Sequence, residues 1–125
     1  MNILLDTHVL IWALENNPTL SDTARNAITE GSNVVFVSSA TVWEINIKKS
    51  IGKLDVPDNL LDEINSHRFT PLDINFDHAE LAGNLPYIHK DPFDRILIAQ
   101  AVIEKLILVT RDDLIAKYDV NVLKA

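Results

Sequence analysis

Four carboxylates stand where an α/β chain would gather side chains for chemistry. Asp6 directly follows the first apolar run, Asp112 closely follows a later one, Asp94 lies near the start of an apolar helix, and Glu44 lies on another helix. If the fold gathers these acids within a few ångströms, their like charges repel one another unless they are protonated or bridged by a cation. Mg²⁺ and Mn²⁺ prefer such oxygen ligands, and a bound cation polarises a phosphoryl oxygen and acidifies water. The pattern indicates metal-assisted phosphodiester hydrolysis.

A purely structural reading competes at each position. Asp6 and Asp112 also suit helix N-caps, and an acid at Asp94 complements the dipole of a helix opened by Asp91 and Pro92. Each reading is reasonable alone. Together, three acids at helix starts or strand ends favour one shared site.

Glu44 is harder to explain as a structural residue. Helical spacing places it on one stripe with Ala40, Ile47 and Ile51, which predicts that it faces inward. An isolated ionised carboxylate is costly there. The alternative is a salt bridge to Lys48 one turn later, whereas a role in holding a cation explains both the burial and the charge.

The elements that must position these acids alternate between short apolar runs and amphipathic stretches. We expect strands at 3–5, 34–37, 69–72, 107–109 and 121–123, and helices at 8–15, 21–31, 40–51, 57–67, 77–83, 92–105 and 112–118. Such alternation predicts an α/β fold with a central parallel sheet of four to five strands and helices on both faces. Ligands of such sheets bind beyond the carboxyl ends of the strands, near the topological switch point.

Composition limits the class of protein. The 125 residues fit a single domain, 1–125, and the chain has no cysteine, which excludes disulfides and fits a reducing cytoplasm. The N-terminal run meets Asp6 early and has no basic region, and the uncharged run 96–103 is far below the ~20 residues of a membrane span. We therefore expect a soluble cytoplasmic protein without a membrane segment.

The net charge of −7, from 11 Lys and Arg against 18 Asp and Glu, argues against nucleic-acid binding on electrostatics alone. Acids clustered around divalent cations would account for part of that deficit, because the ions reverse the local field.

Other catalytic motifs are absent. The four histidines (His8, His67, His78 and His89) lack the paired spacing of zinc hydrolases, Ser38-Ser39 lacks a nucleophile-elbow context, and three scattered glycines make no phosphate-binding loop. A phosphotransfer domain would need paired acids after the first strand, where this chain reads Asp6-Thr7-His8.

In this order of motifs the sequence resembles the PIN-domain family, and within it VapC-like toxins of toxin–antitoxin pairs. The matching segments are Leu4-Leu5-Asp6-Thr7-His8, Val37 to Ile45, His89-Lys90-Asp91-Pro92-Phe93-Asp94-Arg95, Leu97 to Ala101, and Leu108-Val109-Thr110-Arg111-Asp112. Each segment is a weak signal, whereas the ordered set spans nearly the whole chain.

The resemblance implies a metal-dependent endoribonuclease with Asp6, Glu44, Asp94 and Asp112 as its catalytic acids. Asp6, Asp94 and Asp112 would hold Mg²⁺ or Mn²⁺, with Glu44 as a further ligand or a base orienting the water. Thr7 and Thr110 would orient the carboxylates or metal-bound water, and Asp113 or Asp91 could also contribute. The alternative is a catalytically silent PIN-like binding module.

The resemblance also implies partners. RNA would be the substrate. Phosphate binding by so acidic a chain must use local cations, and Lys48, Arg95 and Arg111 lie nearest the site acids in sequence, unless each only neutralises a neighbouring acid. A cognate antitoxin would insert an Arg or Lys into the acidic cleft and pack a helix against the first helices, where Leu10, Ile11, Trp12 and Leu14 offer apolar surface; Trp12 could instead belong to the core. A homodimer is the expected oligomer.

Overall fold

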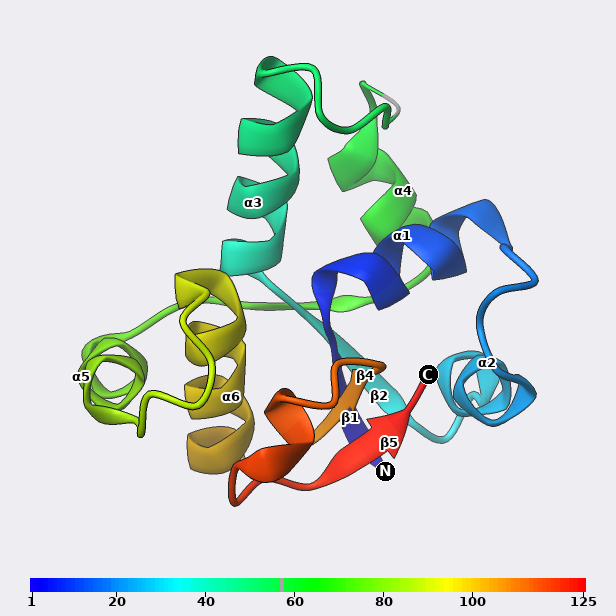
Figure 1. Cartoon of the computed structure of the whole chain (residues 1–125). Helices are drawn as coiled ribbons and strands as arrows, with labels where there is room; N and C mark the ends of the chain where they lie inside the picture. The colour runs from blue at the N-terminus through cyan, green and yellow to red at the C-terminus, as the bar shows by residue number, and fades with distance from the viewer. Residues whose placement is uncertain (57) are drawn as a thin grey trace.

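Five short strands form one parallel sheet at the centre of the molecule (Figure 1), seen in a computed structural model that describes residues 1–56 and 58–125. The strands are β1 (Asn2–Leu5), β2 (Val34–Ser38), β3 (Thr70–Leu72), β4 (Ile107–Thr110) and β5 (Val122–Lys124). They lie in the order β3-β2-β1-β4-β5, and every neighbouring pair is parallel. The predicted α/β fold with a parallel sheet is confirmed.

Within the described residues the strands are joined by α1 (Thr7–Glu15), α2 (Asp22–Thr29), α3 (Ser39–Ser50), α4 (Leu60–Ser66), α5 (Phe76–Asn84) and α6 (Pro92–Glu104). Two expectations were wrong. The segment 112–118 forms only the 3₁₀ turn η1 (Ile115–Lys117), and the second helix ends at Thr29, two residues before the predicted end at Gly31. The predicted helix start at Pro57 lies outside the described residues. None of the described helices is both long and apolar enough to cross a membrane.

Helices cover both faces of the sheet because consecutive strand residues point to opposite sides. Ile3 and Leu5 pack into a core with α1, α2 and α4, whereas Leu4 between them packs against α6 and η1. Figure 1 shows α5 and α6 on one side of the sheet and α1, α2 and α4 on the other. Both predicted helical layers are therefore present.

The first helix is more deeply buried than expected. Of the four apolar residues expected to offer surface, Leu10 and Ile11 belong to the core, whereas Trp12 and Leu14 remain partly exposed. The guanidinium of Arg111 lies 4.6 Å from the centroid of the Trp12 ring. Leu10 and Ile11 therefore do not line an external groove, because the α1 stripe that contains them faces the sheet.

Candidate metal centre

The candidate site lies where the strand order reverses. From β1 the chain moves to β2 and β3 on one side, and then returns to β4 and β5 on the other. Asp6 follows β1 and Asp112 lies two residues beyond β4, so neighbouring strands bring both acids to the same edge. Ligands of open α/β sheets bind at this point.

One cavity of about 340 Å³ brings all four predicted acids together. Its walls come from the ends of β1 and β4 and from α1, α3 and α6; the residues that line it are Asp6, Thr7, His8, Trp12, Glu44, Lys48, Asp91, Asp94, Arg111 and Asp112. Of the acids left open by the sequence, Asp91 lines the cavity, whereas the exposed Asp113 does not.

Asp6 combines a capping contact with a place in the cavity. It is the N-cap of α1, and one carboxylate oxygen accepts the amide N–H of Val9 at 2.9 Å. Burial raises the pKa of the Asp6 carboxyl, against smaller opposing effects of the Thr110 side chain and the Val9 amide. Charge at Asp6 is therefore unfavourable unless a cation lies near it.

Glu44 is only 5% exposed, and both of its carboxylate oxygens have partners. Thr7 Oγ1 donates to Oε1 at 2.5 Å, and Lys48 Nζ lies 2.8 Å from Oε2. Glu44 is buried as predicted, but the helical stripe from which we predicted this does not face inward, because Ile47 and Ile51 on the same stripe are exposed. Glu44 is buried by its contact with α1 instead, and the salt bridge coexists with its place in the cavity.

Asp94 and Asp112 have opposite electrostatic environments. Burial, followed by the nearby Asp91 carboxylate, raises the pKa of Asp94 to about 7. Burial also acts to raise the pKa of Asp112, but hydrogen bonds from His89 and the Leu114 amide outweigh it and leave that pKa lowered. Two carboxylates at one site thus hold protons with different strength.

Sequence reasoning missed His89. Its Nε2 lies 2.8 Å from Asp112 Oδ2 and 2.9 Å from Asp94 Oδ2, and ligand atoms of these three residues all lie within 4.8 Å of one another. A search for paired histidines could not find it, because its partners are acids on two other elements. The available signal was its position just before the Asp91-Pro92 helix start.

The three predicted RNA-binding cations lie in different places. Lys48 and Arg111 line the cavity. Arg95 is 5% exposed and donates to the carbonyls of four residues, namely Ala82, Leu85, Pro86 and His89. Its guanidinium therefore ties the end of α5 and the following segment to α6, and it does not line the acidic cavity.

Thr110 is buried beneath the site rather than in the cavity wall. Its Oγ1 accepts the backbone N–H of Asp112 at 3.1 Å, which fixes the chain as it leaves β4. Asp91 caps α6 by accepting the amides of Phe93 and Asp94, and Pro92 takes the first helical position as expected.

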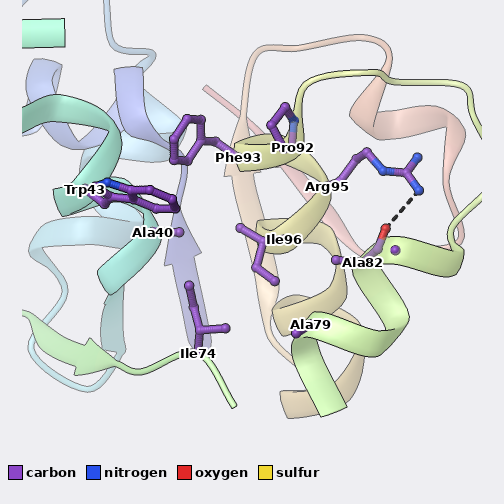
Figure 2. Close-up of a pocket in the computed structure, with 10 residues that line it drawn as sticks. Ala40, Trp43, Ile74, Ala79, Ala82, Pro92, Phe93, Arg95 and Ile96 are labelled. Atoms are coloured by element: carbon purple, nitrogen blue, oxygen red, sulfur yellow. Dashed lines mark hydrogen bonds between the residues drawn. The ribbon is translucent and has the colours of Figure 1, made fainter. Parts of the chain in front are cut away.

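A second hollow lies beside the acidic cavity and has a different lining (Figure 2). Trp43 and Phe93 point toward one another across it, edge to face, with ring centroids 5.4 Å apart. Its remaining walls are mainly aliphatic, and the Arg95 guanidinium turns away to bond Ala82. This apolar groove has no carboxylate, so the candidate chemistry belongs to the cavity.

The donors in the cavity fit a hard divalent cation. They are mainly carboxylate oxygens, and burial raises the pKa of both Asp6 and Asp94, a cost that a bound cation would offset. Mg²⁺ and Mn²⁺ favour carboxylate and water ligands over sulfur. Asp6, Asp94 and Asp112 all line the cavity and could hold such an ion.

Comparison with known proteins extends this description. The model of the PIN domain family matches residues 3–121. No curated protein is significantly similar in sequence.

Among solved structures, a chain of VapBC2 from Rickettsia felis, bound to a promoter DNA fragment, has a TM-score of 0.73 and 16% identity, covering 99% of this chain and 98% of that one. A chain of DNA-bound VapBC from Salmonella typhimurium has a TM-score of 0.71 and 20% identity, with coverage of 99% and 98%. For a toxin–antitoxin complex from Klebsiella pneumoniae the values are 0.68 and 22%, with coverage of 97% and 95%. These likenesses establish a common fold. Because the family model covers nearly the whole chain, the protein belongs to the PIN domain family.

Proposed function

We propose that this protein is an Mg²⁺- or Mn²⁺-dependent endoribonuclease and the toxin of a toxin–antitoxin pair. The observation that carries the proposal is the convergence of Asp6, Glu44, Asp94 and Asp112 on one cavity at the switch point of the sheet. Grouped carboxylates are costly without a cation, and a cation among them suits phosphodiester hydrolysis. Membership of the PIN domain family supports the nuclease activity, and the fold shared with chains of toxin–antitoxin complexes supports the toxin role.

Each acid has a distinct part in the proposed mechanism. Asp6, Asp94 and Asp112 would hold the cation directly or through water. When bound, the cation would polarise the phosphate and make water more acidic. Thr7 and Lys48 fix the two oxygens of Glu44, so that its carboxylate is oriented to accept a proton from the attacking water or to serve as a further ligand.

RNA, single-stranded or looped, is the proposed substrate, in the cytoplasm. The chain carries a net charge of −7, so phosphate binding must depend on local cations. Lys48 and Arg111 are the cationic side chains of the cavity wall and are the proposed phosphate contacts.

The test uses two aspartates that differ in place but not in chemistry. Asp6→Asn should abolish Mg²⁺- or Mn²⁺-dependent RNA cleavage while keeping the fold, because the Asn side-chain oxygen can still accept the Val9 amide. Asp113→Asn, at an exposed position outside the cavity, should cut RNA like the wild type. Wild-type cleavage by the Asp6 variant would contradict the mechanism, and a wild-type protein that binds metal without cutting RNA would support the silent binding module.

We also propose a cognate antitoxin, with an Arg or Lys of its C-terminal segment entering the acidic cavity, and a homodimer as the oligomer. Co-expression with the gene upstream should yield a complex on co-purification, and light scattering should give the mass of a dimer for the protein alone. Inhibition that survives removal of the antitoxin's C-terminal basic residues would contradict the cavity-blocking mechanism.

A further inference from the structure

His89 holds together two acids that come from separate elements. Asp94 lies in the first turn of α6, whereas Asp112 follows β4. The His89 side chain is 12% exposed, and its Nε2 hydrogen-bonds Asp112 Oδ2 at 2.8 Å while lying 2.9 Å from Asp94 Oδ2. The imidazole edge therefore occupies the space between two carboxylates that would otherwise repel each other.

Distances alone would also allow Nε2 to be a metal ligand together with the two carboxylates. The other ring nitrogen distinguishes the two roles. Nδ1 accepts the backbone N–H of Asp91 at 3.2 Å, so its lone pair points toward that amide. With Nδ1 acting as an acceptor, the ring proton is on Nε2, which then has no lone pair left for a metal. In this arrangement His89 donates to Asp112, lies beside Asp94 and does not coordinate a metal ion.

The backbone around His89 is fixed independently of the imidazole. Its N–H donates to the Tyr118 hydroxyl at 2.8 Å, and its carbonyl accepts Arg95 Nη1 at 3.2 Å. The Tyr118 hydroxyl in turn donates to the Pro86 carbonyl at 2.5 Å. The position of the ring is thus set by a buried polar frame that joins the segment before α6 to the turn after β4.

From these contacts we infer that His89 is a positioning residue of the metal centre: its Nε2–H donates to Asp112 and lies against Asp94, and so keeps the remaining oxygen lone pairs of both carboxylates directed toward one cation. The inference rests on the proposed function. A carboxylate has about four lone-pair sites, so one hydrogen bond from His89 leaves capacity for a metal. Loss of a partner that orients metal-binding groups typically lowers metal affinity 10- to 100-fold.

Two amide substitutions separate the two ring nitrogens. In His89→Gln the terminal amide N–H reaches the place of Nε2, so the donor to Asp112 beside Asp94 is kept. In His89→Asn the shorter amide can replace only Nδ1, so the contact with the Asp91 amide is kept while Asp112 loses its donor. Both variants keep a polar side chain within the same frame, and circular dichroism would verify their folding.

Mn²⁺ binding to the full chain, measured by isothermal titration calorimetry without RNA, is the readout. His89→Asn should weaken the Kd for Mn²⁺ by about 10- to 100-fold, whereas His89→Gln should stay close to the wild type. Pulsed EPR of the wild-type Mn²⁺ complex should show no coupling between the ion and a nitrogen of His89. A coupling that is present in the wild type and absent in His89→Gln would contradict this expectation. In the metal-free wild type, ¹⁵N NMR should show the His89 proton on Nε2.

The inference would be overturned by unchanged Mn²⁺ affinity in His89→Asn, or by a wild-type nitrogen coupling that is lost in His89→Gln, since the latter makes His89 a direct ligand. Either result leaves the proposed nuclease activity intact. Conversely, Mn²⁺ affinity could fall in His89→Asn and stay unchanged in His89→Gln while the wild type does not cut RNA. That result would reject the proposed function and support the role of His89.

Discussion

Consecutive residues of two helices face two hollows of opposite character. On α3, Glu44 lines the acidic cavity and Trp43 the apolar groove; on α6, Asp94 and Phe93 divide in the same way. The cavity buries ionisable groups, whereas the groove leaves large apolar side chains open, with Trp43 62% exposed. Both arrangements oppose the usual distribution of polar and apolar groups. The difference is informative because only the cavity identifies, through its donor atoms, the chemistry of its ligand.

Among the residues around the two hollows, the largest effect on stability is expected at Arg95, which lines the groove and donates to the carbonyl of His89 beside the cavity. Arg95→Met removes the donor to four backbone carbonyls, and each buried acceptor left without a partner costs about 1–3 kcal/mol. Because some of these carbonyls are only partly buried, we expect the free energy of unfolding in urea to fall by about 3 kcal/mol. Arg68→Met, at an exposed position, should change it by less than about 0.5 kcal/mol. An Arg95 variant with wild-type stability and weaker RNA binding would mean that Arg95 contacts RNA phosphates instead of stabilising the fold.

Next in size is a pH-dependent effect at Asp94 in the metal-free protein. Its pKa is about 7 in the fold, against an ordinary value of 3.8, so the folded state binds the proton more tightly. The resulting stabilisation is complete below pH 3.8 and is lost as the pH rises through 7. The shift sets a ceiling of about 4 kcal/mol, and partial exposure reduces the expected loss to on the order of 2 kcal/mol.

Asp94→Asn should therefore make the metal-free protein more stable than the wild type at pH 8.5, with little difference at pH 4. Thermal unfolding in EDTA at both values would measure this. Asp113→Asn provides the control and should follow the wild type at both. A variant that is less stable than the wild type at pH 8.5 would mean that the Asp94 carboxylate is stabilised by its surroundings even without metal.

A smaller effect separates two adjacent lysines of α3. Lys48 lines the cavity, whereas Lys49 pairs with the exposed Asp58 away from it. Lys48→Met in a catalytically inactive Asp6→Asn background should weaken RNA binding and lower the salt dependence, log Kd against log salt, by about 0.7. Lys49→Met should leave that slope unchanged. Equal slopes in both variants would mean that Lys48 serves only to neutralise Glu44.

Local sequence signals predicted most of the fold. The alternation of apolar runs and the Asp91-Pro92 helix start gave the parallel sheet and α6, because strand burial and helix capping depend on neighbouring residues. The acids at Asp6 and Asp112 were placed by the general position of sites in such sheets. Their meeting with Asp94 and Glu44 in one cavity follows from that topology.

The misses depend on contacts between distant segments. Arg95 was assigned by proximity to Asp94, but its partners are carbonyls at the end of α5 and after it. No local sequence motif marks His89, because the two acids that it contacts, Asp94 and Asp112, lie on other elements. Ile47 and Ile51 were placed inside by helical spacing, yet α3 extends past the sheet and leaves them exposed. The spacing of residues within one helix shows which of them share a face, but it does not show which face packs against a neighbouring element.

The smallest effect concerns the exposed apolar residues near the groove. Phe76 follows Ile74 of the groove wall by two positions and is 94% exposed, whereas Phe69 is buried in the core beside the sheet. Phe76→Ala should therefore change the free energy of unfolding by less than about 0.5 kcal/mol. The same truncation at Phe69 should cost about 3–5 kcal/mol, because it removes buried contacts and leaves a cavity. Urea unfolding at a protein concentration where light scattering gives a monomer would compare the two. A loss above 1 kcal/mol in Phe76→Ala under those conditions would mean that Phe76 packs against its own chain. The surface beside the groove would then stabilise the monomer, as the residues around the acidic cavity do.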